Sequence, residues 1–306
     1  MFTSIKNIKG ILMTHGVDAG GLQYVNMGAT NDTYEFTRNG ERYIARCYLP
    51  NRAKIADVEY KYIKSFQNNV RSPLVEELFT LNDQTILLYK RLDGNTLSSV
   101  YNSLSDVKKD SVIVDVLNNY FKICRYKETY YGDIVSYKVF SHRTWNSFLK
   151  DNIVSTLLYA DSRHNNNIVY VCNWMLNQLR FFKDMEVASL VWSDFSTDNI
   201  IVHNDGYLSG FVDFEGLISG DPLLGISYFF AQGEQNDISK RIHEILKSEY
   251  HDVELNLDRI DFYAIFRYLR LLKYSDMPLP NGRKRDSINS FLPYSKKLID
   301  KLTTKL

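Results

Sequence analysis

Residues 191–202, Val-Trp-Ser-Asp-Phe-Ser-Thr-Asp-Asn-Ile-Ile-Val, are the stretch of this sequence that decides the fold. Its apolar ends are typical of two short strands, and its polar middle, which contains Asp194 and Asn199, is typical of a loop. The second strand is followed by Asn204-Asp205-Gly206, a strong hairpin turn signal, and then by a further apolar run at 208–212. The pattern therefore predicts a polar loop that enters a β-hairpin.

Three oxygen-bearing side chains occur at the ends of these strands: Asp194, Asn199 and, fourteen residues after Asn199, Asp213. We expect them to converge in one crevice, where they would suit a hard cation such as Mg²⁺ that keeps water and phosphate ligands. Phosphoryl transfer needs this set, because a carboxylate orients the attacking hydroxyl and oxygen ligands hold the metal. Asp and Asn also favour turns for their own sake, an alternative that weakens once the hairpin and Asp213 are added.

Before this stretch, the first ~90 residues predict a small α+β lobe. Its expected elements are helices at 5–14 and 53–67 and strands at 22–27, 33–37, 43–48, 75–80 and 85–89. After residue 91 the pattern becomes mainly helical, with its clearest helix at 166–184 and helical patterns again from about 221. We therefore expect an N-terminal lobe over 1–91 and a helical C-terminal lobe over 92–306.

A cation and a carboxylate occupy inward-facing positions of the first lobe. Arg46 lies in the apolar strand at 43–48, and Glu59 lies on the helix beside Ile55. A carboxylate on an inward face is costly unless it is paired, so we expect it to pair with Arg46. Such a pair beneath a glycine-containing turn, here at Gly28, anchors nucleotide phosphates in kinases. An ordinary structural ion pair is the alternative.

The composition excludes several classes of protein. The 306 residues are 44% hydrophobic and 24% charged with a net charge of +1, which argues against wholesale disorder and against a dedicated nucleic-acid binder. The three cysteines have no disulfide or zinc spacing. No apolar run approaches the ~18–20 residues of a membrane helix, and no signal peptide is visible. We expect a cytoplasmic protein, a monomer or weak dimer, with no nucleic-acid or membrane partner.

The segment 188–231 resembles the catalytic region of the aminoglycoside phosphotransferase family, which has hygromycin phosphotransferase and choline kinase as relatives. The matching motifs are Trp-Ser-Asp-Phe-Ser-Thr-Asp-Asn at 192–199, Val-Asp-Phe-Glu at 212–215 and Gly-Asp-Pro at 220–222. The family usually has His-Gly-Asp, four residues and Asn, then Ile-Asp-Phe/Trp-Glu, then Gly-Asp-Pro. The resemblance spans most of the chain, but only this segment is specific.

The resemblance implies a bilobal, protein-kinase-like α+β fold with a small five-stranded N-lobe and a mainly helical C-lobe. It also implies that Asp194 is the catalytic base or hydroxyl-orienting carboxylate, and that Asn199 and Asp213 hold Mg²⁺. Two positions depart from the usual pattern. Trp192 replaces the usual His, a scaffolding position, and Arg46 stands where many kinases have Lys.

The resemblance assigns the nucleotide to the N-lobe. Arg46, paired with Glu59, would contact the phosphates, and the loop at 28–33, with Gly28 and Asn31, would cover them. Backbone groups from Tyr89 to Arg91 would receive the adenine. Asp221 of the Gly-Asp-Pro motif would be structural and brace the catalytic loop.

The expected function is transfer of the γ-phosphate of ATP or GTP, with Mg²⁺, to a hydroxyl of a small-molecule acceptor. An aminoglycoside-type antibiotic is the first candidate acceptor, which would make the protein an antibiotic-resistance enzyme. Choline, homoserine or another amino alcohol is the alternative. A catalytically silent binding module with a kinase fold also remains open. A protein kinase is disfavoured, since Glu215 stands where an Asp-Phe-Gly motif has its glycine and no Ala-Pro-Glu segment follows.

Overall fold

The chain forms two compact units in the computed structural model. Of the described residues, the first unit contains those up to 104 together with 197–215, and the second contains 105–196 and those from 216 onward. The structure describes residues 4–25, 31–81, 83–134, 142–162, 165–231, 237–250, 257–272, 295–297 and 299–300.

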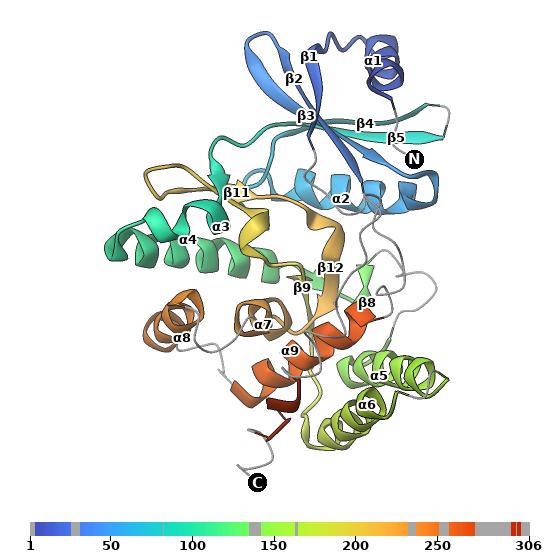
Figure 1. The fold of residues 1–306 in the computed structure, drawn as a ribbon, viewed down its shortest axis with the longest axis vertical. Helices are drawn as coiled ribbons and strands as arrows, with labels where there is room; N and C mark the ends of the chain where they lie inside the picture. The colour runs from blue at the N-terminus through green and yellow to red at the C-terminus, as the bar shows by residue number, and fades with distance from the viewer. Residues whose placement is uncertain are drawn as a thin grey trace. The chain divides into compact units, whose positions relative to one another are not determined.

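The first unit is built on an antiparallel five-stranded sheet of order β1-β2-β3-β5-β4 (Figure 1). Its strands are β1 (Gly20–Val25), β2 (Asp32–Arg38), β3 (Glu41–Tyr48), β4 (Val75–Leu81) and β5 (Gln84–Lys90). The five strands that the sequence predicts are thus confirmed. The turn between β2 and β3 has Asn39 and Gly40 at φ 53° and 79°, as an Asn-Gly hairpin turn requires.

Both faces of this sheet are covered, because alternate residues of a strand point to opposite faces. On β3, Tyr43, Ala45 and Cys47 join the apolar cluster formed with α1 (Ile5–Thr14). The alternate positions of β3 include Arg46 and Tyr48, which contact Glu59 of α2 (Ala53–Phe66) on the other face. The alternation of side chains along β3 therefore directs the cation Arg46 toward α2.

A second, three-stranded sheet of the first unit joins distant parts of the sequence. Its order is β11-β10-β6, with β6 (Asn95–Thr96), β10 (Ile200–Val202) and β11 (Leu208–Phe211), and β6 leads into the short helix α3 (Leu97–Val100). The hairpin predicted after the polar loop is present, and Gly206 of its turn has φ 91°. Because β6 pairs with β10, this compact unit extends past residue 91, where the sequence pattern places the end of the N-lobe.

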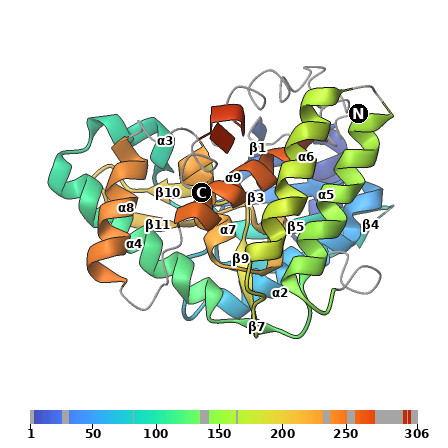
Figure 2. The same ribbon diagram turned by 90° about the horizontal axis from the view of Figure 1, so that it is seen from below.

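The second unit is mainly helical. Figures 1 and 2 show α5 and α6 lying side by side in it. Its helices are α4 (Asp106–Cys124), α5 (Trp145–Asp161), α6 (Asn166–Gln178), α7 (Leu223–Ala231), α8 (Asp237–Glu249) and α9 (Leu257–Leu272). The helix predicted over 166–184 ends at Gln178, where a 3₁₀ turn over Leu179–Phe181 replaces the α-helical pattern.

A four-stranded sheet crosses the second unit in the order β7-β9-β12-β8. Its strands are β7 (Lys127–Glu128), β8 (Gly132–Asp133), β9 (Ala188–Trp192) and β12 (Leu217–Gly220). Every residue of β9 is buried, so the strand that precedes Asp194 is anchored in a core. The two-residue strands and β12 are too short to have a periodic sequence pattern.

Buried side chains fill both units. Cys47, Cys124 and Cys172 are buried and free, as expected for small apolar residues rather than a disulfide framework. No helix in the described part of the chain is both long and apolar enough to span a membrane.

Candidate functional site

A cavity of about 370 Å³ lies within the first unit, between the five-stranded sheet and the hairpin. Residues from three parts of the sequence line it: Asn31, Thr33, Ile44, Arg46, Tyr89, Arg91, Leu92, Gly94, Asn95, Thr96, Ser99, Asp198, Asn199, Ile201, Val212 and Asp213. Binding sites for small molecules are concave in this way, with apolar walls and a few convergent polar groups.

Several side chains that line the cavity are apolar or aromatic. They are Ile44 on β3, Tyr89 on β5, Leu92, Ile201 on β10 and Val212 after β11. The sheet thus supplies one apolar wall and the hairpin another. Such walls suit a flat ring with apolar faces, such as a nucleobase.

Arg46, Glu59, Asp213 and Glu215 form a charged cluster, which we call the polar end of the cavity. Arg46 Nη2 lies 2.8 Å from Asp213 Oδ1, and Arg46 Nη1 lies 3.5 Å from Glu59 Oε1. Glu215 also accepts a hydrogen bond from Nη2. Burial opposes the charged form of Arg46, but the neighbouring carboxylates outweigh it and raise its pKa above the ordinary value. The guanidinium is therefore a fixed cation at this end.

Glu59 is the buried partner that the sequence predicts for Arg46. Its side chain is only 1% exposed, and it accepts hydrogen bonds from the Tyr48 hydroxyl and, at 3.2 Å, from the Phe214 backbone N–H. Burial raises the pKa of Glu59 to about 7, although Arg46 acts in the opposite direction. This carboxylate therefore connects α2 to β3 and to the segment after the hairpin.

Asn199 and Asp213 both line the cavity. They are held beside each other by the backbone, since the Val212 N–H donates to the Asn199 carbonyl at 3.0 Å. Asp213 has φ 63°, a left-handed conformation that non-glycine residues adopt at a cost and that clusters at functional sites. An amide and a carboxylate oxygen facing one cavity are a donor set that fits Mg²⁺.

A resident metal centre would need more protein ligands than these two. No group of three or more His, Cys, Asp or Glu has a metal-binding arrangement within the residues that the structure describes. A cation shared with phosphate needs fewer protein ligands, because phosphate and water oxygens complete its shell. The pair Asn199 and Asp213 is compatible with that second kind of site.

Glu215 joins three parts of the first unit, and the sequence analysis did not single it out as a site residue. It accepts hydrogen bonds from Asn31 at the start of β2, from Arg46 on β3, and from Arg52 immediately before α2. The Asp-Phe-Glu triplet was a visible signal for Glu215, whereas nothing in the sequence pattern marks Arg52. Arg52 therefore adds a second cation beside the polar end.

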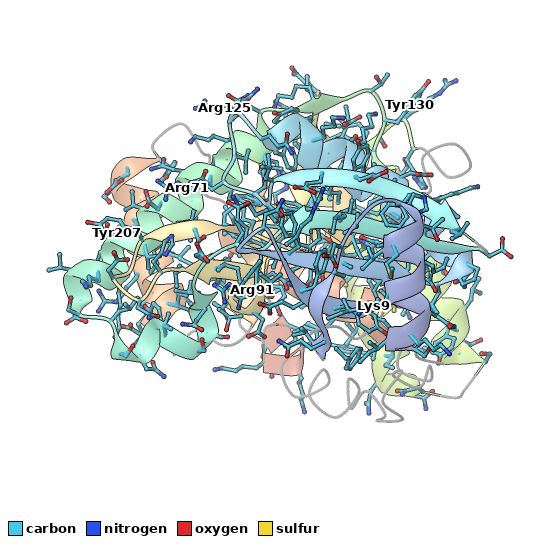
Figure 3. All side chains as sticks on the ribbon, turned by 90° about the horizontal axis from the view of Figure 1, so that it is seen from above. Lys9, Arg71, Arg91, Arg125, Tyr130 and Tyr207 are labelled. Atoms are coloured by element: carbon cyan, nitrogen blue, oxygen red, sulfur yellow. The ribbon has the colours of Figure 1, made fainter. Side chains whose placement is uncertain are left out.

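The segment expected to receive an adenine has its backbone donors engaged. The Lys90 N–H donates to the Leu74 carbonyl and the Arg91 N–H to the Arg42 carbonyl, both at 2.9 Å. Tyr89 and Arg91 still line the cavity, and Arg91 is labelled in Figure 3.

Gly28, the glycine of the expected phosphate-covering loop, lies outside the described residues. Asn31, at the end of that loop, lines the cavity and donates to Glu215. The first unit therefore brings together Asn31, Arg46, Glu59, Asn199 and Asp213.

Asp194 belongs to the second unit, where it lies two residues after the end of β9. Its backbone carbonyl accepts a hydrogen bond from the Ser196 N–H at 2.8 Å, and its carboxylate Oδ1 lies 2.9 Å from Nη2 of Arg267 on α9. The Asp194 side chain is 46% exposed. Trp192, at the position of the usual His, is fully buried with its ring 5.4 Å from that of Phe195. A buried strand end thus presents an accessible carboxylate.

Asp221 of the Gly-Asp-Pro motif is buried and contacts two helices of the second unit. Its Oδ2 accepts a hydrogen bond from the Tyr263 hydroxyl at 2.7 Å and lies 3.2 Å from Arg259 Nε. Its Oδ1 accepts from the Leu223 N–H at 2.9 Å. These contacts tie α9 to the start of α7. Support of the catalytic loop by Asp221 stays a prediction.

A model of the phosphotransferase enzyme family (APH) matches residues 21–251 of the chain. The chain belongs to this family. It is a small-molecule phosphotransferase, as the motifs at 192–199 and 212–215 predict. No match is found among curated protein sequences.

Solved structures of phosphotransferases share the fold of this family member. A thermostable mutant of aminoglycoside phosphotransferase APH(4)-Ia, in a ternary complex with AMP-PNP and hygromycin B, has a TM-score of 0.74 at 16% identity, over 96% of this chain and 98% of that chain. The gentamicin complex of APH(2")-IIa has a TM-score of 0.67 at 16% identity, over 98% and 97%. A putative fructosamine-3-kinase from Haemophilus somnus 129PT has 0.63 at 12% identity, over 94% and 95%. The expected protein-kinase-like α+β fold is confirmed.

Proposed function

We propose that this phosphotransferase transfers the γ-phosphate of ATP to a hydroxyl group of a small, aminoglycoside-type acceptor. The observation that carries the proposal is the cavity of the first unit, which is lined by apolar side chains together with Arg46, Asn199 and Asp213. An apolar slot that leads to a cation and to oxygen ligands matches the chemistry of a nucleoside triphosphate.

The nucleobase would lie between Ile44 of the sheet and Ile201 and Val212 of the hairpin. Its triphosphate would then extend toward Arg46, whose guanidinium is suited to phosphate oxygens. Asp213 Oδ1 lies 2.8 Å from Nη2 of that guanidinium. Binding would exchange this contact for phosphate and release Asp213, while Glu59 keeps Arg46 in place.

Asn199 and Asp213 are the residues that would hold Mg²⁺. When bound, the ion would neutralise charge on the phosphates and fix their orientation. The role of the chain's own residues would be to present an amide and a carboxylate oxygen to the same cavity. The bond between the Val212 N–H and the Asn199 carbonyl keeps the two backbone segments close.

Asp194 would orient the acceptor hydroxyl and accept its proton. The hydroxyl oxygen forms a bond to the γ-phosphorus while the bond from that phosphorus to the bridging oxygen of ADP breaks. ADP then leaves, and the acceptor retains the phosphate. Positioning and charge neutralisation supply most of the rate of such a transfer.

The aminoglycoside-type acceptor is supported by two structures of similar fold, which contain hygromycin B and gentamicin. The third similar structure is that of a putative fructosamine-3-kinase. Fructosamines, which are amino sugars outside the antibiotics, therefore belong in the same test as acceptors.

The test is a measurement of ADP release with ATP or GTP across a panel that contains hygromycin B, gentamicin, a fructosamine and choline. We expect turnover with an aminoglycoside, and a loss of kcat of at least about 10³ in Asp194→Ala. Asp161→Asn, an exposed carboxylate of the same unit, is the matched control and should keep its kcat. Nucleotide binding without turnover for every acceptor would instead favour a silent binding module.

A further inference from the structure

The second unit contains an arginine beside Asp194 that no sequence motif marks. Arg267 on α9 places Nη2 2.9 Å from Asp194 Oδ1. Its guanidinium carbon lies 3.3 Å from the centre of the Tyr228 ring on α7. Nη1 is buried and has no hydrogen-bond partner among the described residues. The guanidinium is thus stacked on a ring and joined to one carboxylate.

This arrangement is costly as a plain structural ion pair. Burial disfavours the charged form and lowers the pKa of Arg267, against the opposing effects of Tyr228 and Asp194. A buried guanidinium donor without a partner adds a further penalty. Stacking on Tyr228 offsets part of this cost. Stacking also fixes the orientation of the planar guanidinium. A lysine ammonium has no such plane and could not be oriented in this way.

The exposed half of the pair is the functional half. The Asp194 side chain is 46% exposed, whereas that of Arg267 is 17% exposed. The Asp194 side chain can adopt several rotamers, and its ion pair with the Arg267 guanidinium selects one of them. The buried partner therefore determines where the accessible carboxylate points.

The same helix carries a comparable pair one turn later. Arg270 places Nη2 2.5 Å from Asp133 Oδ1 on β8, and its guanidinium carbon lies 5.6 Å from the centre of the Phe148 ring. This pair also joins α9 to the rest of the unit, but Asp133 is not a candidate catalytic residue. Arg270 thus provides a control for the purely structural effect of losing an α9 arginine.

We propose that Arg267, held by Tyr228, is a positioning residue that sets the orientation of the Asp194 carboxylate toward the acceptor hydroxyl. The inference rests on the proposed function of Asp194. It predicts an effect on kcat rather than on the KM for nucleotide, because the cavity residues belong to the first unit.

The experiment measures kcat, both KM values and Tm for Arg267→Gln, Arg267→Lys and Arg270→Gln, with the best acceptor of the panel. We expect kcat to fall about 10- to 100-fold in Arg267→Gln, since misplacement of a reacting group by ~1 Å has an effect of that size. Arg267→Lys should recover part of the loss. Arg270→Gln should keep its kcat even if its Tm falls equally.

Tyr228→Leu and Tyr228→Phe test the stacking contact, because only phenylalanine keeps the ring. The leucine variant should lose more kcat than the phenylalanine variant. In Arg267→Ala, added guanidinium at millimolar concentration should restore part of the kcat, and it should restore none in Asp194→Ala.

Three results would overturn the inference. One is a kcat of Arg267→Gln within twofold of wild type, and another is an equal loss of kcat in Arg270→Gln. Either would leave the proposed function intact, provided that Asp194→Ala is inactive. A wild-type protein that turns over no acceptor would overturn both proposals together.

Discussion

Single buried charges determine the chemistry at the polar end of the cavity. Arg46 contacts Glu59, Asp213 and Glu215, so three carboxylates share one guanidinium. Glu215 also contacts the guanidinium of Arg52. Removing one member of such a network leaves an unpaired buried charge, which is far more destabilising than loss of an exposed pair. Variants here should therefore preserve shape and change charge.

Asp213→Asn should weaken Mg²⁺-dependent nucleotide binding by at least about tenfold, because it removes an anionic oxygen ligand. Asparagine tolerates the φ of 63° at this position, so the backbone should be retained. Asp83→Asn is the matched control, since Asp83 has φ 61° and does not line the cavity. Titration calorimetry with and without Mg²⁺ measures both; equal affinities for the two variants would contradict the assignment.

Glu59 makes the stability of the nucleotide-free protein depend on pH. Burial raises its folded-state pKa to about 7 from the ordinary 4.5. Below about pH 4.5 both states hold the proton. As the pH rises toward 7, the unfolded chain ionises first, so this group's contribution to stability is lost over that window. In Glu59→Gln the loss should be absent, a difference of roughly 1–3 kcal/mol between pH 5 and pH 8.

Denaturant unfolding at several pH values measures this difference. Glu41→Gln, which changes a carboxylate on the exposed start of β3, is the control and should follow the wild-type curve over the same window. A Glu59→Gln curve parallel to that of wild type would show that Glu59 does not titrate there.

At the scale of elements, the pairing of β6 with β10 forms part of the cavity lining. Gly94, which precedes β6, lines the cavity with φ 116°. A Cβ at this position would lie 2.2 Å from the Val202 carbonyl oxygen, a distance that no relaxed side chain has. The turn into β6 therefore requires glycine, and the hairpin can approach the end of β5 only because of it.

Gly94→Ala should destabilise the protein by about 1–3 kcal/mol, since it combines an unfavourable φ with a backbone clash. It should also weaken nucleotide binding, because the clash displaces a cavity wall. Gly10→Ala is the control: it lies in α1 with nothing within 4 Å of its Cβ, and alanine favours helix by up to about 1 kcal/mol. Thermal unfolding of both variants decides; equal Tm values would contradict the clash.

At the scale of the whole molecule, the three cysteines are buried and are divided between the two units. Cys47 lies in β3 of the first unit, and Cys124 and Cys172 lie in helices of the second. Burial raises the pKa of Cys47, and it raises the pKa of Cys124 to about 12. A thiol that is buried and protonated is a poor nucleophile.

A colorimetric thiol reagent should therefore react with fewer than one thiol per native chain on the minute scale, and with all three in denaturant. Bound nucleotide should slow the reaction of Cys47 further, because ligand binding stabilises the first unit against opening. Cys47→Ser and Cys124→Ser assign the rates. Fast reaction of a native thiol would show that the corresponding core is open.

Local patterns in the sequence determined a large part of this protein. Short apolar runs separated by turns, one of them Asn-Gly, predict the five strands. The spacing of Asp194, Asn199 and Asp213 predicts the phosphotransferase chemistry, and a lone cation in an apolar strand predicts the Arg46–Glu59 pair. Each of these signals involves near neighbours along the chain, or a polar group that burial makes costly, so no knowledge of distant packing is needed to read it.

Only the tertiary structure decided the rest. The pairing of β6 with β10, the joining of Arg52 and Asn31 by Glu215, and the contact of Arg267 with Asp194 all link residues far apart in the sequence. A surface arginine and a buried one look alike in a sequence, because the difference lies in which carboxylate and which ring the folded chain places beside the guanidinium. The residues that surround the predicted site therefore emerged only with the fold.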